Sequence, residues 1–356
     1  MNMGIGKLRR RDVYHQGMTA THNDATLEPA SAAVAGRAPR WLRGIFVANL
    51  VAQTAIVVTG GVVRLTGSGL GCPTWPQCAP GSFVPTETQA ESWHKYVEFG
   101  NRLLTFVLGI LAIAAIVGAI AAARRMRAAG YPARKPILIL AAVPLVGTLV
   151  QAVLGGITVL TGLHPATVAL HFLVSAVLIA ATLVLVWRAR ENADRPLVKL
   201  GEPAVRILMW VLVAVGAVVM VLGTIVTGSG PHSGDAEAPN RFNLDPEQMS
   251  WLHADAVILF IGLMVGLLVA LTLTKAPTRA RTATWILLGV SLAQGLIGYV
   301  QYFTGLPWVL VAFHLLGSTL VWIALLRIPL TMRTRGIVTD QPTNGSMPIA
   351  KKSSAK

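Results

Sequence analysis

Charged residues are scarce in this sequence, and their scarcity excludes an ordinary soluble fold. Of the 356 residues only 13% are charged, while 54% are hydrophobic; a soluble chain would carry about 25% charged residues. Long apolar runs alternate with short connections that are basic or rich in Gly and Pro. Helices that rise about 1.5 Å per residue need runs of about 20 apolar residues to cross a bilayer core of about 30 Å. The sequence therefore predicts an all-α integral membrane protein.

The apolar runs predict eight transmembrane helices, arranged as two four-helix bundles. Their expected limits are 42–63, 96–122, 136–160, 166–187, 206–227, 251–274, 282–303 and 308–328.

Positive charge is nearly missing from the connections after the first, third, fifth and seventh runs. The net charge is +15, and all but four of the 30 Lys and Arg residues lie in the tails, in the other connections or at the helix ends beside them. This asymmetry predicts a multi-pass protein of the cell membrane with both termini in the cytoplasm. The charge thus indicates topology and contact with anionic lipid, and we expect no nucleic-acid partner. The four exceptions are Arg64, Lys95, Arg102 and Arg241.

Cysteine occurs only twice, as Cys72 and Cys78 in the first long outer loop. The outer side of the membrane permits disulfides, so the pair is either a structural disulfide or a dithiol that exchanges electrons. A metal site is disfavoured because no third ligand lies close by in the sequence.

The chain contains an internal duplication. Gln151 lies twenty residues before His171, Gln294 lies twenty residues before His314, and both long outer loops begin with Thr-Gly-Ser-Gly. Each half has an even number of spans, so we expect a pseudo-twofold axis along the membrane normal. The predicted parts are a disordered cytoplasmic tail at 1–41, an N-terminal half at 42–190, a cytoplasmic linker at 191–205, a C-terminal half at 206–330 and a second disordered cytoplasmic tail at 331–356.

Three histidines lie inside predicted spans, at similar depth in the outer half of the bilayer: His171, His253 and His314. Ionisable groups inside a membrane are costly and mark functional sites. Neutral imidazole is a strong ligand for haem iron. His253 and His314 therefore predict a bis-histidine haem site in the C-terminal half. The alternative is that each imidazole only donates a hydrogen bond between helices.

The N-terminal half differs from the C-terminal half at this depth. It carries Glu98, Asn101 and Arg102 where the other half has Ser250 and His253. One haem ligand, His171, beside a carboxylate indicates a reaction site rather than an electron carrier. An ion pair between Glu98 and Arg102, four residues apart on one helix face, is an alternative that is compatible with this role.

Other outer residues have simpler interpretations. We expect His94 at the interfacial rim, His232 in a turn and Trp75 in an outer aromatic belt. Arg64 and Arg241 are candidates for contact with haem propionates.

Several segments resemble one enzyme family, the haem A synthases of bacteria, with the actinobacterial branch as the candidate. They are GGVVRLTGSGLGCPTWPQC at 60–78, VEFGNR at 97–102, QAVLGGIT at 151–158, GSGPHSGD at 228–235 and the region around His314. The resemblance covers about 41–330. It implies oxidation of the C8 methyl group of haem O to the formyl group of haem A, for cytochrome oxidase assembly.

The resemblance also implies roles for individual residues. Haem b would lie on His253 and His314, and the substrate haem O would lie near Glu98 and His171. Cys72 and Cys78 would form the loop disulfide of the family. The family's Glu-x-x-His-Arg motif has His where this chain has Asn101. Three alternatives follow: Asn101 leaves the sixth iron position open, another residue such as His94 ligates instead, or the resting ligation differs in this branch.

Two other functions compete with this one: a dihaem cytochrome that takes electrons from quinol without modifying haem, and a haem or metal transporter. The asymmetry between the halves argues against the dihaem cytochrome, because a protein that only transfers electrons would be expected to have two histidine ligands in each half. Haem O synthase and cytochrome oxidase assembly factors are candidate partners of the enzyme, quinol is a candidate electron partner, and a homo-oligomer is a candidate state.

Overall fold

The computed structural model describes residues 38–130, 132–191, 196–235 and 239–335. Within these ranges eight helices are long and apolar enough to cross a membrane, which confirms the predicted class and number of spans. The largest extension beyond a predicted limit is at the end of α3, where arginines, which are good helix formers, continue the helix. The helices are α2 (Arg40–Leu65), α3 (His94–Ala128), α4 (Lys135–Leu160), α5 (Pro165–Arg190), α6 (Pro203–Ser229), α7 (Pro246–Leu273), α8 (Thr278–Phe303) and α9 (Trp308–Thr331).

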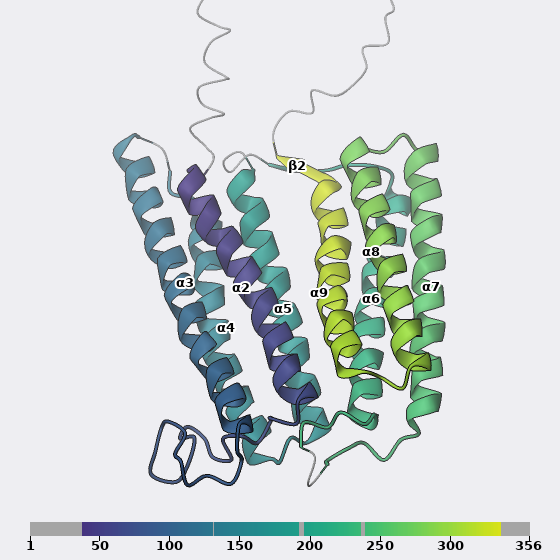
Figure 1. Ribbon diagram of the computed structural model, residues 1–356. Coiled ribbons are helices and arrows are strands. Elements are labelled where there is room, and N and C mark those ends of the chain that lie inside the picture. The colour runs from purple at the N-terminus through teal and green to yellow at the C-terminus, as the bar shows by residue number, and fades with distance from the viewer. Residues whose placement is uncertain (1–37, 131, 192–195, 236–238, 336–356) are drawn as a thin grey trace, which may run out of the picture.

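The helices form two bundles that stand side by side (Figure 1). In the first, α2, α3, α4 and α5 pack in sequence and α5 closes on α2; α6, α7, α8 and α9 repeat this order in the second. The bundles meet through α5 with α9, α2 with α9, and α5 with α6. In the two halves α2 corresponds to α6, and α5 corresponds to α9. A twofold rotation would therefore turn the α2–α9 contact into the α6–α5 contact, and both contacts are present. The pseudo-twofold axis stays a prediction, and this pairing supports it.

Each bundle has its own apolar core, and both cores lie toward the same side of the membrane. The first gathers Leu42, Phe46 and Leu185 from the start of α2 and the end of α5. The second gathers the corresponding parts of α6, α7, α8 and α9, with Leu212 and Ile328 fully buried. Tight apolar packing therefore fills the half of each bundle nearer the ends of the described chain. The opposite half, where the three intramembrane histidines lie, is left for a polar site.

Large apolar side chains also cover the outside of the bundles. Phe106, Ile110, Leu296 and Phe303 are all more than half exposed. Such a surface is suited to lipid, because its side chains are apolar and the backbone polar groups in the helix interior are hydrogen-bonded within the helix.

A short sheet joins the two ends of the C-terminal half. Strand β1 (Leu197–Lys199) lies in the predicted linker and pairs antiparallel with β2 (Arg333–Arg335). Glu191 adds ion pairs with Arg188, Arg333 and Arg335. The prediction of a disordered tail from 331 is thus wrong for residues 331–335, because backbone pairing and these ion pairs hold them. The rest of that tail, and residues 1–37 of the first, lie outside the described residues.

The two outer loops are joined to each other at the lower edge of Figure 1. The Gly69 amide donates to the Gly234 carbonyl at 2.9 Å, and the Arg64 guanidinium donates to the Thr227 carbonyl at 2.9 Å. A Cβ atom on Gly69 would lie 2.6 Å from Leu163 Cδ1 and 3.0 Å from the Gly234 carbonyl oxygen, so a larger residue would crowd the contact between the two loops. The contact fixes the outer loop of one half against that of the other.

Candidate functional site

Each intramembrane histidine packs against a glycine of the preceding helix. A Cβ atom built on that glycine would lie 3.2–3.5 Å from the imidazole Cε1 atom, so each ring packs directly on the glycine backbone, most closely at Gly298. Each histidine also lies six or seven residues after the start of its helix, which supports the predicted common depth. The three pairs are Gly155 with His171, Gly223 with His253, and Gly298 with His314.

A fourth pair of the same kind involves Asn101. A Cβ atom on Gly60 of α2 would lie 3.8 Å from Asn101 Nδ2, and Asn101 is seven residues into α3. Its side-chain oxygen accepts a hydrogen bond of 2.8 Å from the Thr59 hydroxyl. Asn101 therefore occupies the place that histidine occupies in the other three helix pairs. A groove of about 250 Å³ between α2 and α3 is lined by Thr59, Val62, Val63, Val97, Asn101 and Leu104.

The duplicated glutamines hold the backbone of two of the histidines. Gln151 Nε2 donates to the His171 carbonyl at 3.0 Å, and Gln294 Nε2 donates to the His314 carbonyl at 2.7 Å. Gln151 also bonds the Ser175 hydroxyl one turn later. The matching spacing in the sequence thus corresponds to the same contact in both halves, between the third helix and the fourth.

The imidazoles fit haem ligation. The Nδ1 atoms of His171, His253 and His314 are buried and have no hydrogen-bond partner in the described residues. Among the same residues no group of three or more His, Cys, Asp or Glu side chains could hold a metal ion by itself. A haem iron needs only one or two protein ligands, because the porphyrin supplies the other four. Isolated imidazoles facing glycine therefore suit haem better than a bare metal ion.

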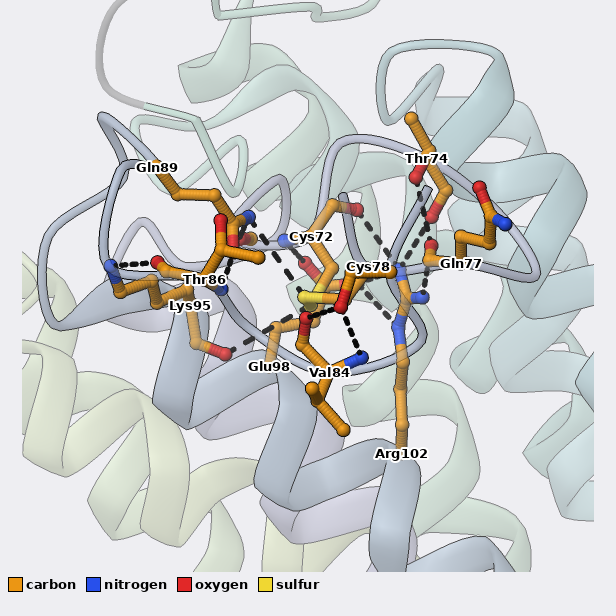
Figure 2. The surroundings of a disulfide bond; sticks show 12 residues. Cys72, Thr74, Gln77, Cys78, Val84, Thr86, Gln89, Lys95, Glu98 and Arg102 are labelled. Atoms are coloured by element: carbon orange, nitrogen blue, oxygen red, sulfur yellow. Dashed lines mark hydrogen bonds and ion pairs between the residues drawn. A yellow bond between two sulfur atoms is a disulfide. The ribbon is translucent and has the colours of Figure 1, made fainter. Parts of the chain in front are cut away.

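Glu98 is buried at the outer end of α3 and is bonded to the cysteine loop (Figure 2). Its Oε2 atom accepts from the Cys72 backbone amide at 2.7 Å. Its Oε1 atom accepts from Arg102 at 2.6 and 3.0 Å, so the predicted ion pair is present. Both carboxylate oxygens are thus held in place beside the loop.

Arg102 links the same carboxylate to the loop backbone. Its guanidinium donates to the carbonyls of Cys72, Thr74 and Gln77 at 2.9–3.1 Å. Lys95, one turn before Glu98, donates to the Thr86 carbonyl at 2.7 Å. Lys95, Glu98 and Arg102 lie on one face of α3 because residues three or four apart are neighbours on a helix. That face therefore holds the loop, whereas Asn101 faces α2.

Cys72 and Cys78 form a disulfide, and both residues are fully buried. The disulfide agrees with the predicted pairing and leaves no thiol for a metal site in this state. Whether the pair exchanges electrons during a reaction stays a prediction.

Trp75 connects the cysteine loop to α4. A Cβ atom on Gly156 would lie only 2.4 Å from the Trp75 ring, so the indole packs directly on this glycine. The adjacent Gly155 is the residue that faces His171. Trp75, which the sequence placed in an aromatic belt, instead docks the loop onto the helix turn that supports His171.

The remaining outer residues bond to the loops. His94 Nδ1 bonds the Ser68 hydroxyl at 2.8 Å, and its ring stacks on Trp93. Partial burial and the nearby Arg64 and Arg241 cations lower the pKa of His232 from its ordinary value of 6.5. Arg241 donates to the Pro231 carbonyl at 3.0 Å. Contact of Arg64 and Arg241 with haem propionates stays a prediction.

Sequence reasoning missed the residues that contact these side chains from the neighbouring helices, chiefly Thr59 and four glycines. One signal was present: Gly155 and Gly298 each lie sixteen residues before a histidine, within the same repeat that contains Gln151 and Gln294. Gly60 and Gly223 have no such spacing, because a long outer loop separates them from Asn101 and His253.

Comparison with known proteins identifies a matching family and several named relatives. A family model described as "Cytochrome oxidase assembly protein" matches residues 43–326. The relatives include "Heme A synthase" of Lysinibacillus sphaericus, 31% identical over 190 residues, or 51% of this chain and 58% of the relative. The "Heme A synthase" of Exiguobacterium sibiricum is 28% identical over 49% of this chain and 55% of the relative. That of Alkalihalophilus pseudofirmus is 33% identical over 41% and 47%.

The chain thus spans about half the length of the curated relatives that it matches. The family model, in contrast, covers both helical halves, from the start of α2 to near the end of α9. On that match, the chain belongs to the cytochrome oxidase assembly protein family.

Proposed function

We propose that this protein is a haem A synthase, which oxidises the C8 methyl group of haem O to a formyl group for cytochrome oxidase biogenesis. Relatives that carry the name "Heme A synthase" match it. Two successive hydroxylations of the methyl carbon give a geminal diol, which loses water to form the aldehyde. In each hydroxylation one oxygen atom of dioxygen is added to the carbon, and two electrons from the electron partner with two protons reduce the other oxygen atom to water.

The observation that supports the proposal most directly is that the two halves differ in their side chains at the depth of the histidines. In the C-terminal half, His253 and His314 both face a glycine, and Ser250 stands where the N-terminal half has Glu98. In the N-terminal half, His171 faces a glycine, Asn101 replaces the second histidine, and Glu98 is buried one turn away. A second site for electron transfer alone would need no buried carboxylate. The N-terminal half, residues 42–190, is therefore the proposed reaction site.

His171 is the proposed ligand for the iron of haem O. Its ring packs against Gly155, and its backbone carbonyl accepts a hydrogen bond from Gln151. The substrate is apolar at its farnesyl tail, so it can enter from the bilayer along the exposed apolar surface of the bundle.

Glu98 is the proposed catalytic residue, placed near the C8 methyl edge. Its carboxylate is held by the Cys72 amide and by Arg102, so it cannot rotate away from the loop without breaking these bonds. A fixed carboxylate can take up the proton that is lost as the methyl group is oxidised. It can equally stabilise positive charge that develops on that carbon. Asn101 and Arg102 complete the proposed substrate site.

The C-terminal half, residues 206–330, is the proposed site of a resident haem b on His253 and His314. This group, when bound, supplies one-electron transfer between the reaction site and an electron partner. The two imidazoles pack against Gly223 and Gly298, and Gln294 donates a hydrogen bond to the His314 backbone carbonyl.

The proposed location is the cell membrane, with both ends of the chain in the cytoplasm. Arg and Lys residues near the ends of α3, α5 and α9 support this orientation. Quinol is the proposed electron partner, and haem O synthase and cytochrome oxidase assembly factors are the proposed protein partners.

The catalytic role is tested by replacing Glu98 in cells that supply haem O. Glu98→Ala and Glu98→Gln should each lower haem A output by about 10²–10⁴-fold, the usual contribution of a positioned acid or base. Gln keeps an acceptor for the Cys72 amide, so its loss of activity isolates the charge. The matched control is Glu247→Ala, an exposed carboxylate in the first turn of α7.

The absorption of the C-terminal haem should be unchanged in all three variants. Normal haem A output from both Glu98 variants would contradict the role.

A further inference from the structure

Asn101 occupies the position of the histidine in the pair formed by α2 and α3. Only in this pair does a threonine, Thr59, precede the glycine that faces the side chain. Thr59 precedes Gly60, whereas the residues before the other three glycines are Leu154, Leu222 and Ile297. A hydroxyl therefore appears only where the facing residue is an amide. The Thr59 hydroxyl lies 2.8 Å from Asn101 Oδ1 and 3.2 Å from the Ile56 carbonyl oxygen. Its single proton goes to the closer acceptor, Asn101 Oδ1, which leaves the Nδ2 group as the donor of that side chain.

An amide is a poor replacement for imidazole as an iron ligand. Its nitrogen lone pair is delocalised into the carbonyl, and its oxygen is a hard ligand that suits Mg²⁺ and Ca²⁺ better than haem iron. The Nδ2 group is instead a hydrogen-bond donor, and its residue lines the groove of about 250 Å³ between α2 and α3. Apart from Thr59 and Asn101, that groove is lined by three valines and a leucine.

His94 does not supply the missing ligand in this arrangement. Its Nδ1 atom is bonded to Ser68 at 2.8 Å and its ring stacks on Trp93 at a centroid distance of 4.0 Å. Both contacts keep it at the outer end of α3, in the segment that meets the loop.

We propose that Asn101 and Thr59 form an open distal site, in which haem iron held by His171 binds a small diatomic ligand that accepts a hydrogen bond from the Asn101 amide. This inference rests on the proposed function, because it requires haem on His171. The distal donors and free space around a haem decide between ligand binding and simple electron transfer. The ligand class is dioxygen and its analogues, and carbon monoxide is the probe, since it binds ferrous iron without electron transfer.

The test uses the full-length protein, purified from cells that supply haem O and reduced with dithionite under carbon monoxide. In the wild type, the optical difference spectrum should show carbon monoxide on one haem, and His171→Ala should remove that haem. Asn101→His should abolish binding, because it restores a second imidazole. Asn101→Leu should still bind, with the C–O stretching frequency raised because the hydrogen bond is lost.

Thr59→Val is the second variant and leaves Asn101 in place. It should keep carbon monoxide binding but shift or broaden the C–O band, because the amide loses its anchor.

Three results would overturn the proposal. In the first, His171→Ala removes one haem but the wild type binds no carbon monoxide. A protein ligand then fills the sixth position of that iron, so the open distal site is wrong while the proposed haem site on His171 is retained. If Asn101→His binds carbon monoxide as well as the wild type, Asn101 does not face the iron. If His171→Ala keeps its full haem content, both the inference and the proposed N-terminal site are wrong.

Discussion

Asn101, His171, His253 and His314 each lie against a glycine of the neighbouring helix, and at one of these glycines a methyl group would crowd the ring. The tightest approach is at Gly298, where an added Cβ atom would lie 3.2 Å from His314 Cε1. Gly295, on the same helix, has open space around its Cα atom. The two positions therefore separate the effect of crowding at the imidazole from the general effect of alanine in α8.

Gly298→Ala should displace the His314 ring by a few tenths of an ångström and weaken haem retention in the C-terminal half. Overpacking of this kind costs about 1–3 kcal/mol. The measurement is haem content per protein, with the electron paramagnetic resonance spectrum as a second readout. Gly295→Ala is the control and should retain haem fully. Equal haem retention and identical spectra in the two variants would show that Gly298 does not support a ligand.

At the scale of elements, the loop between α2 and α3 is fixed from two directions. Lys95, Glu98 and Arg102 bond its backbone from α3, and Trp75 packs on Gly156 of α4. Gly71 brings the loop against the first turn of α3, since a Cβ atom there would lie 2.4 Å from the His94 carbonyl oxygen. The loop thus contacts the helices that carry Glu98 and support His171.

Gly156→Ala should loosen this loop, because the new methyl group would overlap the Trp75 ring. Loss of about 1.4 kcal/mol of docking free energy would raise the open population about tenfold. Cys72 and Cys78 are fully buried, so the reduction of their disulfide by dithiothreitol should become faster by a similar factor. Gly109→Ala, on α3 in open space, is the control. An unchanged reduction rate in Gly156→Ala would mean that Trp75 does not hold the loop.

The elements themselves could be predicted from the sequence, and the supports of the site could not. Apolar run length alone placed eight helices, because the bilayer fixes the length that a helix must have. His171, His253, His314 and Glu98 were found because polar groups inside such runs are rare. Thr59 was missed because a threonine beside a glycine is unremarkable in a helix until its neighbour on α3 is known. The docking of Trp75 joins residues about eighty positions apart, and no periodicity in the sequence encodes it.

At the scale of the whole molecule, contacts between the halves occur at three levels. In the outer loops, the Gly69 amide donates to the Gly234 carbonyl. Between α9 and α5, Trp322 Nε1 donates to the Ala176 carbonyl at 3.0 Å. At the opposite end, Glu191 forms ion pairs with Arg333 and Arg335. These contacts fix the two halves relative to each other. The proposed reaction site and the proposed resident haem therefore keep a constant separation, as electron transfer between them requires.

The orientation of this molecule in the membrane can be tested with reporter fusions. Alkaline phosphatase inserted in the loop before α3, near Thr88, should be active because this loop is expected outside. The same enzyme placed after α9 should be inactive, while a fluorescent protein there should fluoresce. The opposite pattern at both positions would reverse the topology and place the disulfide in the cytoplasm, where reducing conditions disfavour it.

The central claim, conversion of haem O to haem A, is tested most directly by chemical analysis of the haems bound to the purified protein. The wild type is expressed in cells that supply haem O, and its non-covalent haems are extracted, separated by chromatography and identified by mass. The account predicts haem A, or its hydroxylated precursor, alongside haem B. Haem B alone, with haem O available and no oxidised form present, would contradict it and would favour a membrane cytochrome that only transfers electrons.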